Sequence, residues 1–407
     1  MSSTEATSSL PKYVYLYFLC QSLNATSAVI SVTVAATVGL LIAPSEGWAT
    51  LPYGMQFLCM LLATYPVSVL MTRKGRKFGF VVGALGLASA GLVGYHAVME
   101  NSFIALMLAH SLLGISMACT NYYRFAAVDN LVGKTKTRAV SLVIAGGLVS
   151  AVLGPYIGST FREVDGFPLF ALCYMALVAL AAVNILIIAL LPKEIMDKKV
   201  NTSDSKISTD APNFLTNVSP LFFVAVLSGA LGFGLMNLVM IQSSLQMHHL
   251  HVHFDHSAMA IQWHVVAMFA PSFLSGFLVG KLGHQKVIFT GLALFMATFL
   301  INLFADGYAS ILVSLITLGL AWNFTYVSGS AYISVVLEGN KSAKKLQGVG
   351  ETGIALFAMA GAMTPALLIS SIGWKGTNLL CICLVILCVL VQLLLIVSNK
   401  RQVMKAV

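Results

Sequence analysis

Charged residues are scarce in this chain: Asp, Glu, Lys and Arg make up only 9% of its 407 residues, whereas 58% are hydrophobic. A soluble domain carries about 25% charged residues, so this composition excludes a soluble globular protein. Enzyme signatures are also lacking, because the chain has neither a phosphate-binding glycine loop nor a catalytic-triad motif. We therefore expect a membrane protein that is not an enzyme.

Paired cysteines and a secretion signal are lacking as well. The seven cysteines fall within hydrophobic runs and none forms a CxxC pair, so we expect them to pack as small apolar side chains. The first residues, MSSTEATSSLPKY, contain neither a basic region nor a small-residue cleavage site. We expect no signal peptide.

Long apolar runs recur along the whole chain. A bilayer core of about 30 Å is crossed by about 20 helical residues. Runs of sufficient length lie at 13–42, 51–71, 79–99, 103–125, 138–160, 167–191, 217–243, 257–280, 286–305, 308–333, 347–370 and 375–398. The sequence predicts an all-α membrane protein with twelve transmembrane helices.

A polar segment at 193–216 interrupts the apolar runs after the sixth span. It separates residues 1–192 from residues 217–407, and we interpret it as a cytoplasmic linker between two six-helix bundles. The string SVLMTRKGRK after span 2 corresponds to GFLVGKLGHQ after span 8, so that Gly75 and Gly283 are 208 residues apart. The two bundles are therefore predicted to be pseudo-repeats.

Basic residues lie almost entirely on one side of this topology. If the N-terminus is inside, all of the 23 Lys and Arg residues except Arg124, Arg162 and Lys375 fall on the cytoplasmic side. Short cytoplasmic loops retain Lys and Arg, so we expect both termini in the cytoplasm. The net charge of +9 is explained by this topology, and we expect membrane lipid but no nucleic acid as a partner.

Met and His are concentrated in spans 7 and 8. Met236 and Met240 are four residues apart, and so are His264 and Met268, so each pair shares one helix face. Thioethers and imidazole suit Cu(I), which makes these four residues a candidate transient copper site. The alternative is ordinary core packing by methionine with a hydrogen-bonded core histidine.

A His-rich segment joins spans 7 and 8 on the non-cytoplasmic side. Its side chains are candidates for external capture of Cu(II), Zn(II) or Ni(II) through an adaptable, extended segment. A solvated loop without function is the alternative. The candidate residues are Met247, His248, His249, His251, His253 and His256.

Spans 4 and 10 carry residues suited to an organic substrate. Tyr122, Tyr123 and Arg124, with Trp322 and Tyr326, supply aromatic faces and a cation that suit a flavin-like ring. The alternatives are aromatic anchoring at the membrane interface and an ion pair of Arg124 with Asp129.

Two ionisable residues within spans are candidates for coupling. His110 in span 4 is a candidate proton carrier, because an imidazole can titrate near neutral pH even within a membrane span. Glu351, at the start of span 11, is either a coupling carboxylate or an interfacial charge, and the second interpretation is favoured.

Twelve spans, a central loop and a Gly-basic turn after spans 2 and 8 resemble the major facilitator superfamily, whose signature there is GxxxDRxGRK. The arginine of the signature corresponds to Arg73, but Ser68 replaces the first glycine and Thr72 the acidic residue. The conformational latch of the family must therefore use other contacts. Arg73, and Asp129 paired with Arg138, are candidates for such a latch, and a purely structural ion pair is the alternative for Asp129 and Arg138.

The MxxxM and HxxxM motifs, with the strings YYRFAA, QWHVVAMFAPSF and WNFTYV, resemble the CcoA-like branch of that superfamily. This resemblance implies a monomeric alternating-access transporter of the bacterial inner membrane with no tightly bound cofactor, and a copper ion or small molecule as substrate. Copper uptake is the first hypothesis. Uptake of an organic solute such as riboflavin, carried by relatives of the branch, is the second, and a non-transporting membrane sensor is the third.

Overall fold

The computed structural model describes residues 10–45, 48, 51–192, 218–340 and 342–406, and these residues contain helices but no strand. The predicted linker at 193–216 lies outside the described residues. The first half contains α1 (Lys12–Ile42), α2 (Leu51–Lys74), α3 (Arg76–Met99), α4 (Phe103–Thr120), α5 (Tyr123–Ala126), α6 (Lys134–Ala145), α7 (Gly147–Thr160) and α8 (Ala171–Leu190). The second half contains α10 (Pro220–His249), α11 (Phe254–Phe269), α12 (Ser272–Leu282), α13 (His284–Phe304), α14 (Tyr308–Trp322), the π-helical turn η2 (Asn323–Val327), α15 (Ser328–Val336), α16 (Ala343–Met363) and α17 (Pro365–Ala406).

These elements make up the twelve predicted spans within the described residues. Ten spans are long and apolar enough to cross a membrane, and α1 and α16 complete the set. Spans 4, 5, 8 and 10 are each broken into shorter helices. The expected boundary between spans 11 and 12, at 371–374, contains the bend at Gly373, where φ is 70°, but α16 already ends at Met363, before the predicted end of span 11.

The backbone confirms the internal repeat. Gly75 and Gly283 precede corresponding helices with nearly equal angles, φ 89° and ψ 159° against φ 84° and ψ 156°. Positive φ values also recur at a spacing of 206 or 207 residues, in the pairs Asn101 and Gly307, Gly133 and Gly339, and Gly166 and Gly373. Positive φ is uncommon, so its recurrence at one spacing shows that the two halves turn at corresponding places.

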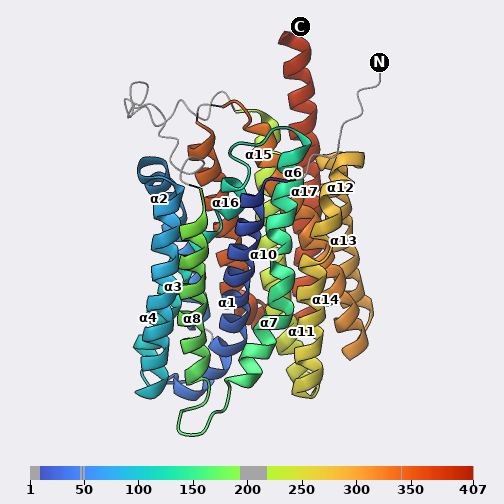
Figure 1. The fold of residues 1–407 in the computed structure, drawn as a ribbon. Helices are drawn as coiled ribbons and strands as arrows, with labels where there is room; N and C mark the ends of the chain where they lie inside the picture. The colour runs from blue at the N-terminus through green and yellow to red at the C-terminus, as the bar shows by residue number, and fades with distance from the viewer. Residues whose placement is uncertain (1–9, 46–47, 49–50, 193–217, 341, 407) are drawn as a thin grey trace.

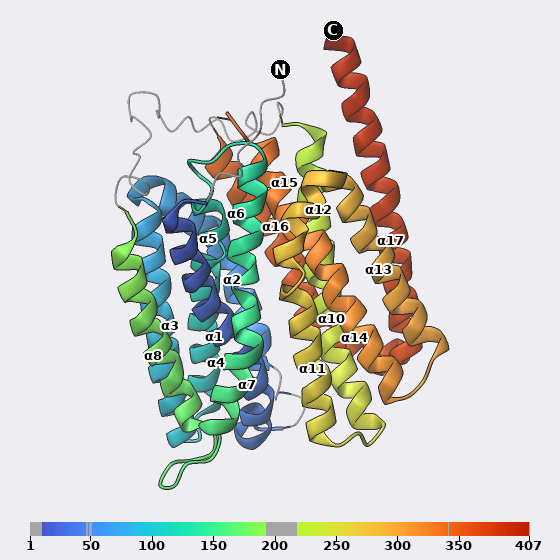
Figure 2. The same cartoon turned by 45° about the vertical axis from the view of Figure 1, so that its right-hand side comes forward.

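The two halves lie side by side. Figure 2 shows α1 to α8 on one side and α10 to α17 on the other, with the start of α1 and the end of α17 at the same end of the molecule. We call this end the terminal side and the opposite end the distal side (Figure 1). The halves meet where α2 packs on α16, α6 on α12 and α15, and α7 on α11.

Hydrogen bonds between the halves are concentrated on the terminal side. Ser68 Oγ donates to the Lys344 carbonyl at 3.1 Å, and Lys136 Nζ donates to the Ser334 carbonyl at 3.4 Å. Thr137 Oγ1 and His284 Nε2 are 3.2 Å apart. These contacts hold α2 and α6 against the second half at this end of the molecule.

The contact at the first glycine turn differs from the expected latch. Arg76 donates to both carboxylate oxygens of Asp129, at 2.9 and 3.0 Å, and its Nη2 also donates to Gln347 Oε1 of α16 at 3.1 Å. The expected pair of Asp129 with Arg138 is therefore wrong, because the turn at Gly75 brings Arg76 to Asp129. Arg73 and Arg138 are exposed.

Candidate substrate cavity

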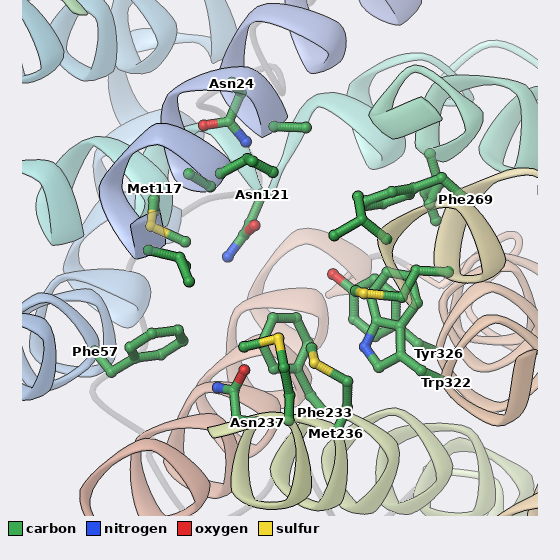
Figure 3. A pocket seen from close by; sticks show the side chains of 18 of the residues that line it. Asn24, Phe57, Met117, Asn121, Phe233, Met236, Asn237, Phe269, Trp322 and Tyr326 are labelled. Carbon is green, nitrogen blue, oxygen red and sulfur yellow. The ribbon is translucent and has the colours of Figure 1, made fainter. Parts of the chain in front are cut away.

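A cavity lies between the two halves, on the distal side of the contacts just described (Figure 3). It extends from Arg124 and Tyr326 to Tyr53 and Ile261, which lie near the distal ends of α2 and α11. Its volume is about 160 Å³. A single water needs roughly 10–15 Å³ by this measure, so the space accommodates a solute of many atoms.

Breaks in spans 4 and 10 shape the wall of the cavity. In span 4 the helix α4 ends at Thr120 and the short helix α5 follows from Tyr123, and Asn121 and Arg124 of this interrupted stretch line the cavity. Span 10 widens into the π-helical turn η2, from which Tyr326 reaches the cavity. Local π-helical turns within α-helices are frequent at functional sites. Both halves therefore use irregular backbone to aim polar groups at the cavity.

Aromatic rings form one wall of the cavity. The rings of Trp322 and Tyr326 stack, with centroids 4.6 Å apart and planes inclined by 21°. Phe233 packs edge-on against Tyr326 at 5.3 Å, and Phe269 packs edge-on against Trp322 at 5.4 Å. Trp322 Nε1 is buried and finds no hydrogen-bond partner among the described residues. The Trp322 side chain lines the cavity (Figure 3), which makes this buried N–H a candidate donor to a bound solute.

Amide side chains supply most of the other polar groups. Figure 3 shows Asn24, Asn121 and Asn237 around the cavity. Asn24 Oδ1 accepts a hydrogen bond from Thr120 Oγ1 at 2.8 Å, and Asn237 Nδ2 donates to the Ala358 carbonyl at 3.0 Å. These bonds fix one end of each amide against a neighbouring helix. An apolar wall with a few fixed polar groups is typical of small-molecule sites.

Four methionines also line the cavity: Met117, Met236, Met240 and Met268. Met117 Sδ accepts a hydrogen bond from Gln56 Nε2 at 2.9 Å. The cavity thus combines thioethers with aromatic rings and amides.

One buried ion pair joins the halves at the terminal end of the cavity. Arg124 Nη2 of α5 lies 2.5 Å from Glu351 Oε2 of α16, and Arg124 Nη1 donates to Tyr326 Oη. Glu351 is only 2% exposed, so the favoured interpretation as an interfacial charge is wrong. The alternative interpretation, in which Arg124 pairs with Asp129, is also wrong, because Asp129 pairs with Arg76.

The comparisons with known proteins agree with this architecture. The family model described as Major Facilitator Superfamily matches residues 16–261 and 227–406. The chain belongs to the major facilitator superfamily. It is thus an integral membrane transporter rather than an enzyme.

Two relatives of this transporter cover almost its whole length. The riboflavin transporter RfnT of Brucella anthropi is 31% identical over 408 residues, which span 99% of this chain and 100% of the relative. The uncharacterized MFS-type transporter YdeG of Bacillus subtilis is 27% identical over 400 residues, 93% of this chain and 91% of the relative.

Solved structures share the fold at low sequence identity. The human organic anion transporter MFSD10 superposes with a TM-score of 0.74 at 14% identity, covering 94% of this chain and 100% of that one. The transporter FucP in the outward conformation superposes with a TM-score of 0.70 at 15% identity, and the match covers 95% of this chain and 98% of FucP. An outward-facing bacterial homologue of the iron transporter ferroportin superposes with a TM-score of 0.70 at 16% identity, and the match covers 95% of this chain and 99% of the homologue.

The transporter brings together three of the four residues in the expected copper site. Met236, Met240 and Met268 line the cavity, whereas His264 lies outside its lining. The His264 ring is fully buried, and its Nδ1 donates to the Leu315 carbonyl of α14 at 2.8 Å. Its Nδ1 therefore bonds to a neighbouring helix of its own half, as the core-packing alternative expects, whereas its Nε2 is buried without a hydrogen-bond partner among the described residues.

The His-rich segment is shorter than the expected extended loop. The helix α10 continues to His249 and α11 begins at Phe254, so only residues 250–253 connect them. Met247 is buried, and the side chain of His248 lies outside the description. His249, His251, His253 and His256 are exposed, and no group of three or more His, Cys, Asp or Glu side chains suited to a metal occurs in the described part of the transporter.

Three further candidates lie behind the cavity wall. Tyr122 Oη donates to the Thr64 carbonyl at 3.1 Å, and Asn184 Nδ2 donates to Tyr123 Oη at 3.0 Å, so the expectation that both tyrosines line the cavity is wrong. The His110 Nδ1 donates to Gln56 Oε1 at 3.1 Å and its Nε2 accepts from Tyr174 Oη at 3.1 Å. A proton-carrying role for His110 stays a prediction.

Sequence reasoning singled out Trp322 and Tyr326 of the lining but missed its amides and the further aromatic ring of Phe233. It did not single out Asn24, Asn121, Asn237 or Phe233, although all four line the cavity. A signal was present for the amides, since polar side chains inside membrane spans usually face a cavity or a partner. Phe233 gave no such signal, because phenylalanine is common on every face of a membrane helix.

Proposed function

We propose that this transporter takes up riboflavin, or a solute of the same chemical class, by alternating access of the cavity to the two sides of the membrane. Such a solute has a flat aromatic ring system with carbonyl and N–H groups on its edge. The observation that carries the proposal is the stacked wall of Trp322 and Tyr326 facing amide side chains across one cavity. The name of the Brucella anthropi relative supports the same substrate.

The chemistry of the wall suits this solute class better than an inorganic ion. Stacking of a flat heteroaromatic ring on an aromatic side chain contributes about 1–3 kcal/mol in nucleic-acid sites. Trp322 Nε1 would donate to a ring carbonyl, and Asn121 and Asn237 are placed for edge contacts. The cavity volume also exceeds what one ion requires.

Uptake of copper is the second candidate, because the sulfurs of Met117, Met236, Met240 and Met268 share the cavity. It has weaker support, since His264, the expected imidazole ligand, lies outside the lining that these sulfurs share. A non-transporting sensor has no support from the fold or the relatives.

We further propose that the terminal side faces the cytoplasm of a bacterial inner membrane. The distribution of Lys and Arg supports this orientation. The contacts between the halves on the terminal side would then close the cytoplasmic side, and the cavity would lie between these contacts and the outer surface of the membrane. This is the conformation expected before uptake.

Transport into lipid vesicles containing the purified protein tests the two substrates side by side. One set of vesicles receives radiolabelled riboflavin and the other receives radioactive Cu(I). We expect riboflavin uptake above that of empty vesicles, reduced about tenfold or more in Trp322→Ala by loss of the stacking surface. Trp263→Ala is the matched control, because Trp263 is 51% exposed on the outer surface of the helix bundle.

The methionine variants separate the two hypotheses. Met236→Leu/Met240→Leu removes both sulfurs and nearly conserves volume, so riboflavin uptake should change little. Met259→Leu, at a position that is 40% exposed, is its control. The proposal would be overturned in favour of copper by two results together: copper uptake by wild type that Met236→Leu/Met240→Leu abolishes, and no riboflavin uptake by wild type or any variant.

A further inference from the structure

The ion pair of Arg124 and Glu351 is isolated from water. Their side chains are 5% and 2% exposed, and they lie 2.5 Å apart on opposite halves of the protein. Arg124 forms part of the cavity wall, whereas Glu351 lies behind it and is not part of the lining. The pair therefore separates the cavity from the terminal-side contacts.

Hydrogen bonding in this cluster is incomplete. Glu351 Oε1 and Arg124 Nε are both buried, and neither finds a hydrogen-bond partner among the described residues. A carboxylate with one unsatisfied oxygen in an apolar site is unfavourable, and protonation of that oxygen removes the charge.

Rocking of the two halves must break this pair. The helices α5 and α16 belong to different halves, so opening of the terminal side moves Arg124 away from Glu351. Removing one partner from a buried ion pair leaves an uncompensated charge and is strongly unfavourable. The separation becomes accessible if Glu351 is neutral when it loses Arg124 and if the Arg124 cation, which lines the cavity, is solvated there.

We propose that Glu351 binds the proton that couples transport to the proton gradient. One proton passes from distal-side water through the cavity to Glu351 Oε1, and Arg124 is released from the pair. The halves then rock, Glu351 gives the proton to water on the terminal side, and the pair forms again as the cavity returns. Each cycle with a neutral solute thus carries one proton and one positive charge across the membrane.

Among the groups around Glu351, no other carboxyl contacts it in the described residues, so the proton is assigned to Glu351 itself. Arg124, Tyr326 and Tyr122 are the ionisable groups that interact with it electrostatically. Arg76 is bonded to Gln347, one turn away, but its charge is already paired with Asp129. Other side chains packed beside this segment of α16 come from α2, α10 and α15, and they include Ser68, Tyr65, Val226, Phe222 and Ile333.

Proton movement that accompanies riboflavin transport tests the proposal. Riboflavin is used as the transported solute because of the proposed function, and the role of Glu351 does not otherwise depend on it. Vesicles containing the protein enclose a pH-sensitive dye, and riboflavin is added outside without a pH gradient. We expect riboflavin-dependent acidification inside with wild type and none with Glu351→Gln. Glu351→Asp keeps a carboxyl and should restore part of the acidification. Riboflavin uptake by wild type without proton movement, or acidification by Glu351→Gln equal to wild type, would refute the proposal.

The matched control is Glu338→Gln, which should acidify as wild type does. Glu338 Oε2 also pairs across the halves, 3.7 Å from Lys136 Nζ, but its side chain is 37% exposed, so water stabilises its charge when that pair opens. Loss of proton coupling in both variants would contradict a specific role for Glu351.

A second measurement needs no transported substrate. Spin labels at Val132→Cys and Leu282→Cys, two exposed positions on the terminal side of opposite halves, report the distance between the halves. Lowering the pH should lengthen this distance in the otherwise wild-type protein and leave it unchanged when Glu351→Gln is added. A distance independent of pH in both proteins refutes proton binding by Glu351, whereas a pH response without riboflavin transport refutes only the proposed substrate.

Discussion

The rings of Trp322 and Tyr326 stack at 4.6 Å on the wall of the cavity, and the indole N–H of Trp322 is buried without a partner among the described residues. The same side chain therefore offers a stacking face and a donor. These two contributions are separable by substitution.

Trp322→Phe is expected to weaken riboflavin binding less than Trp322→Ala does. Phenylalanine keeps an aromatic face but loses the N–H donor, and one hydrogen bond contributes about 0.5–1.5 kcal/mol. The Kd should rise roughly twofold to tenfold, measured by titration of the purified protein with riboflavin. Trp263→Phe, on the exposed face of α11, should leave the Kd unchanged. Equal affinities of Trp322→Phe and wild type would show that Nε1 does not contact the solute.

Gly114→Ala is expected to destabilise the first half. A Cβ at Gly114 would lie 2.0 Å from the Gln56 carbonyl oxygen of α2, so the two helices would have to separate. Overpacking of this kind costs about 1–3 kcal/mol. The Tm of the purified protein should fall in Gly114→Ala. Gly158→Ala meets nothing within 4 Å and should match wild type or exceed it. A wild-type Tm for Gly114→Ala would mean that α2 and α4 separate without cost.

The sequence predicted the fold almost completely, because membrane insertion imposes long apolar runs and places Lys and Arg on one side. The correspondence of Gly75 with Gly283 was also readable, since both turns require the same positive φ. The breaks in spans 4 and 10 were not readable. The π-helical turn at Asn323–Val327 depends on how its side chains pack against other helices, which periodicity does not encode.

The site was predicted only in part. Residue spacing placed Met236 and Met240 on one helix face, and both line the cavity. The same argument placed His264 with Met268, but the Leu315 carbonyl of α14 binds the His264 ring. The partner of Glu351 is 227 residues away in sequence, so no local pattern connected it with Arg124. Contacts between the halves depend on the packed fold and are therefore the hardest part of the site to predict.

Arg124→Gln should destabilise the protein more than the double variant Arg124→Gln/Glu351→Gln. The single change leaves the Glu351 carboxylate buried without its cation, which typically costs about 3–5 kcal/mol. The double change removes both charges, so the free energy of unfolding should recover toward the wild-type value. Thermal unfolding in detergent at constant pH measures the difference. Additive losses in the double variant would show that the two charges do not stabilise each other.

Gln347→Ala should favour opening of the terminal side. Gln347 Oε1 accepts from Arg76 Nη2 at 3.1 Å across the halves, and the Gln347 side chain is buried. A hydrogen bond to a charged group contributes about 1.5–3 kcal/mol, so its loss should raise the open population by roughly tenfold or more. Spin labels at Val132→Cys and Leu282→Cys measure that population. Gln285→Ala removes a 3.2 Å bond to Tyr332 inside the second half and should leave the distances unchanged. Unchanged distances in Gln347→Ala would mean that the hydrogen bond from Arg76 to Gln347 does not hold the halves together.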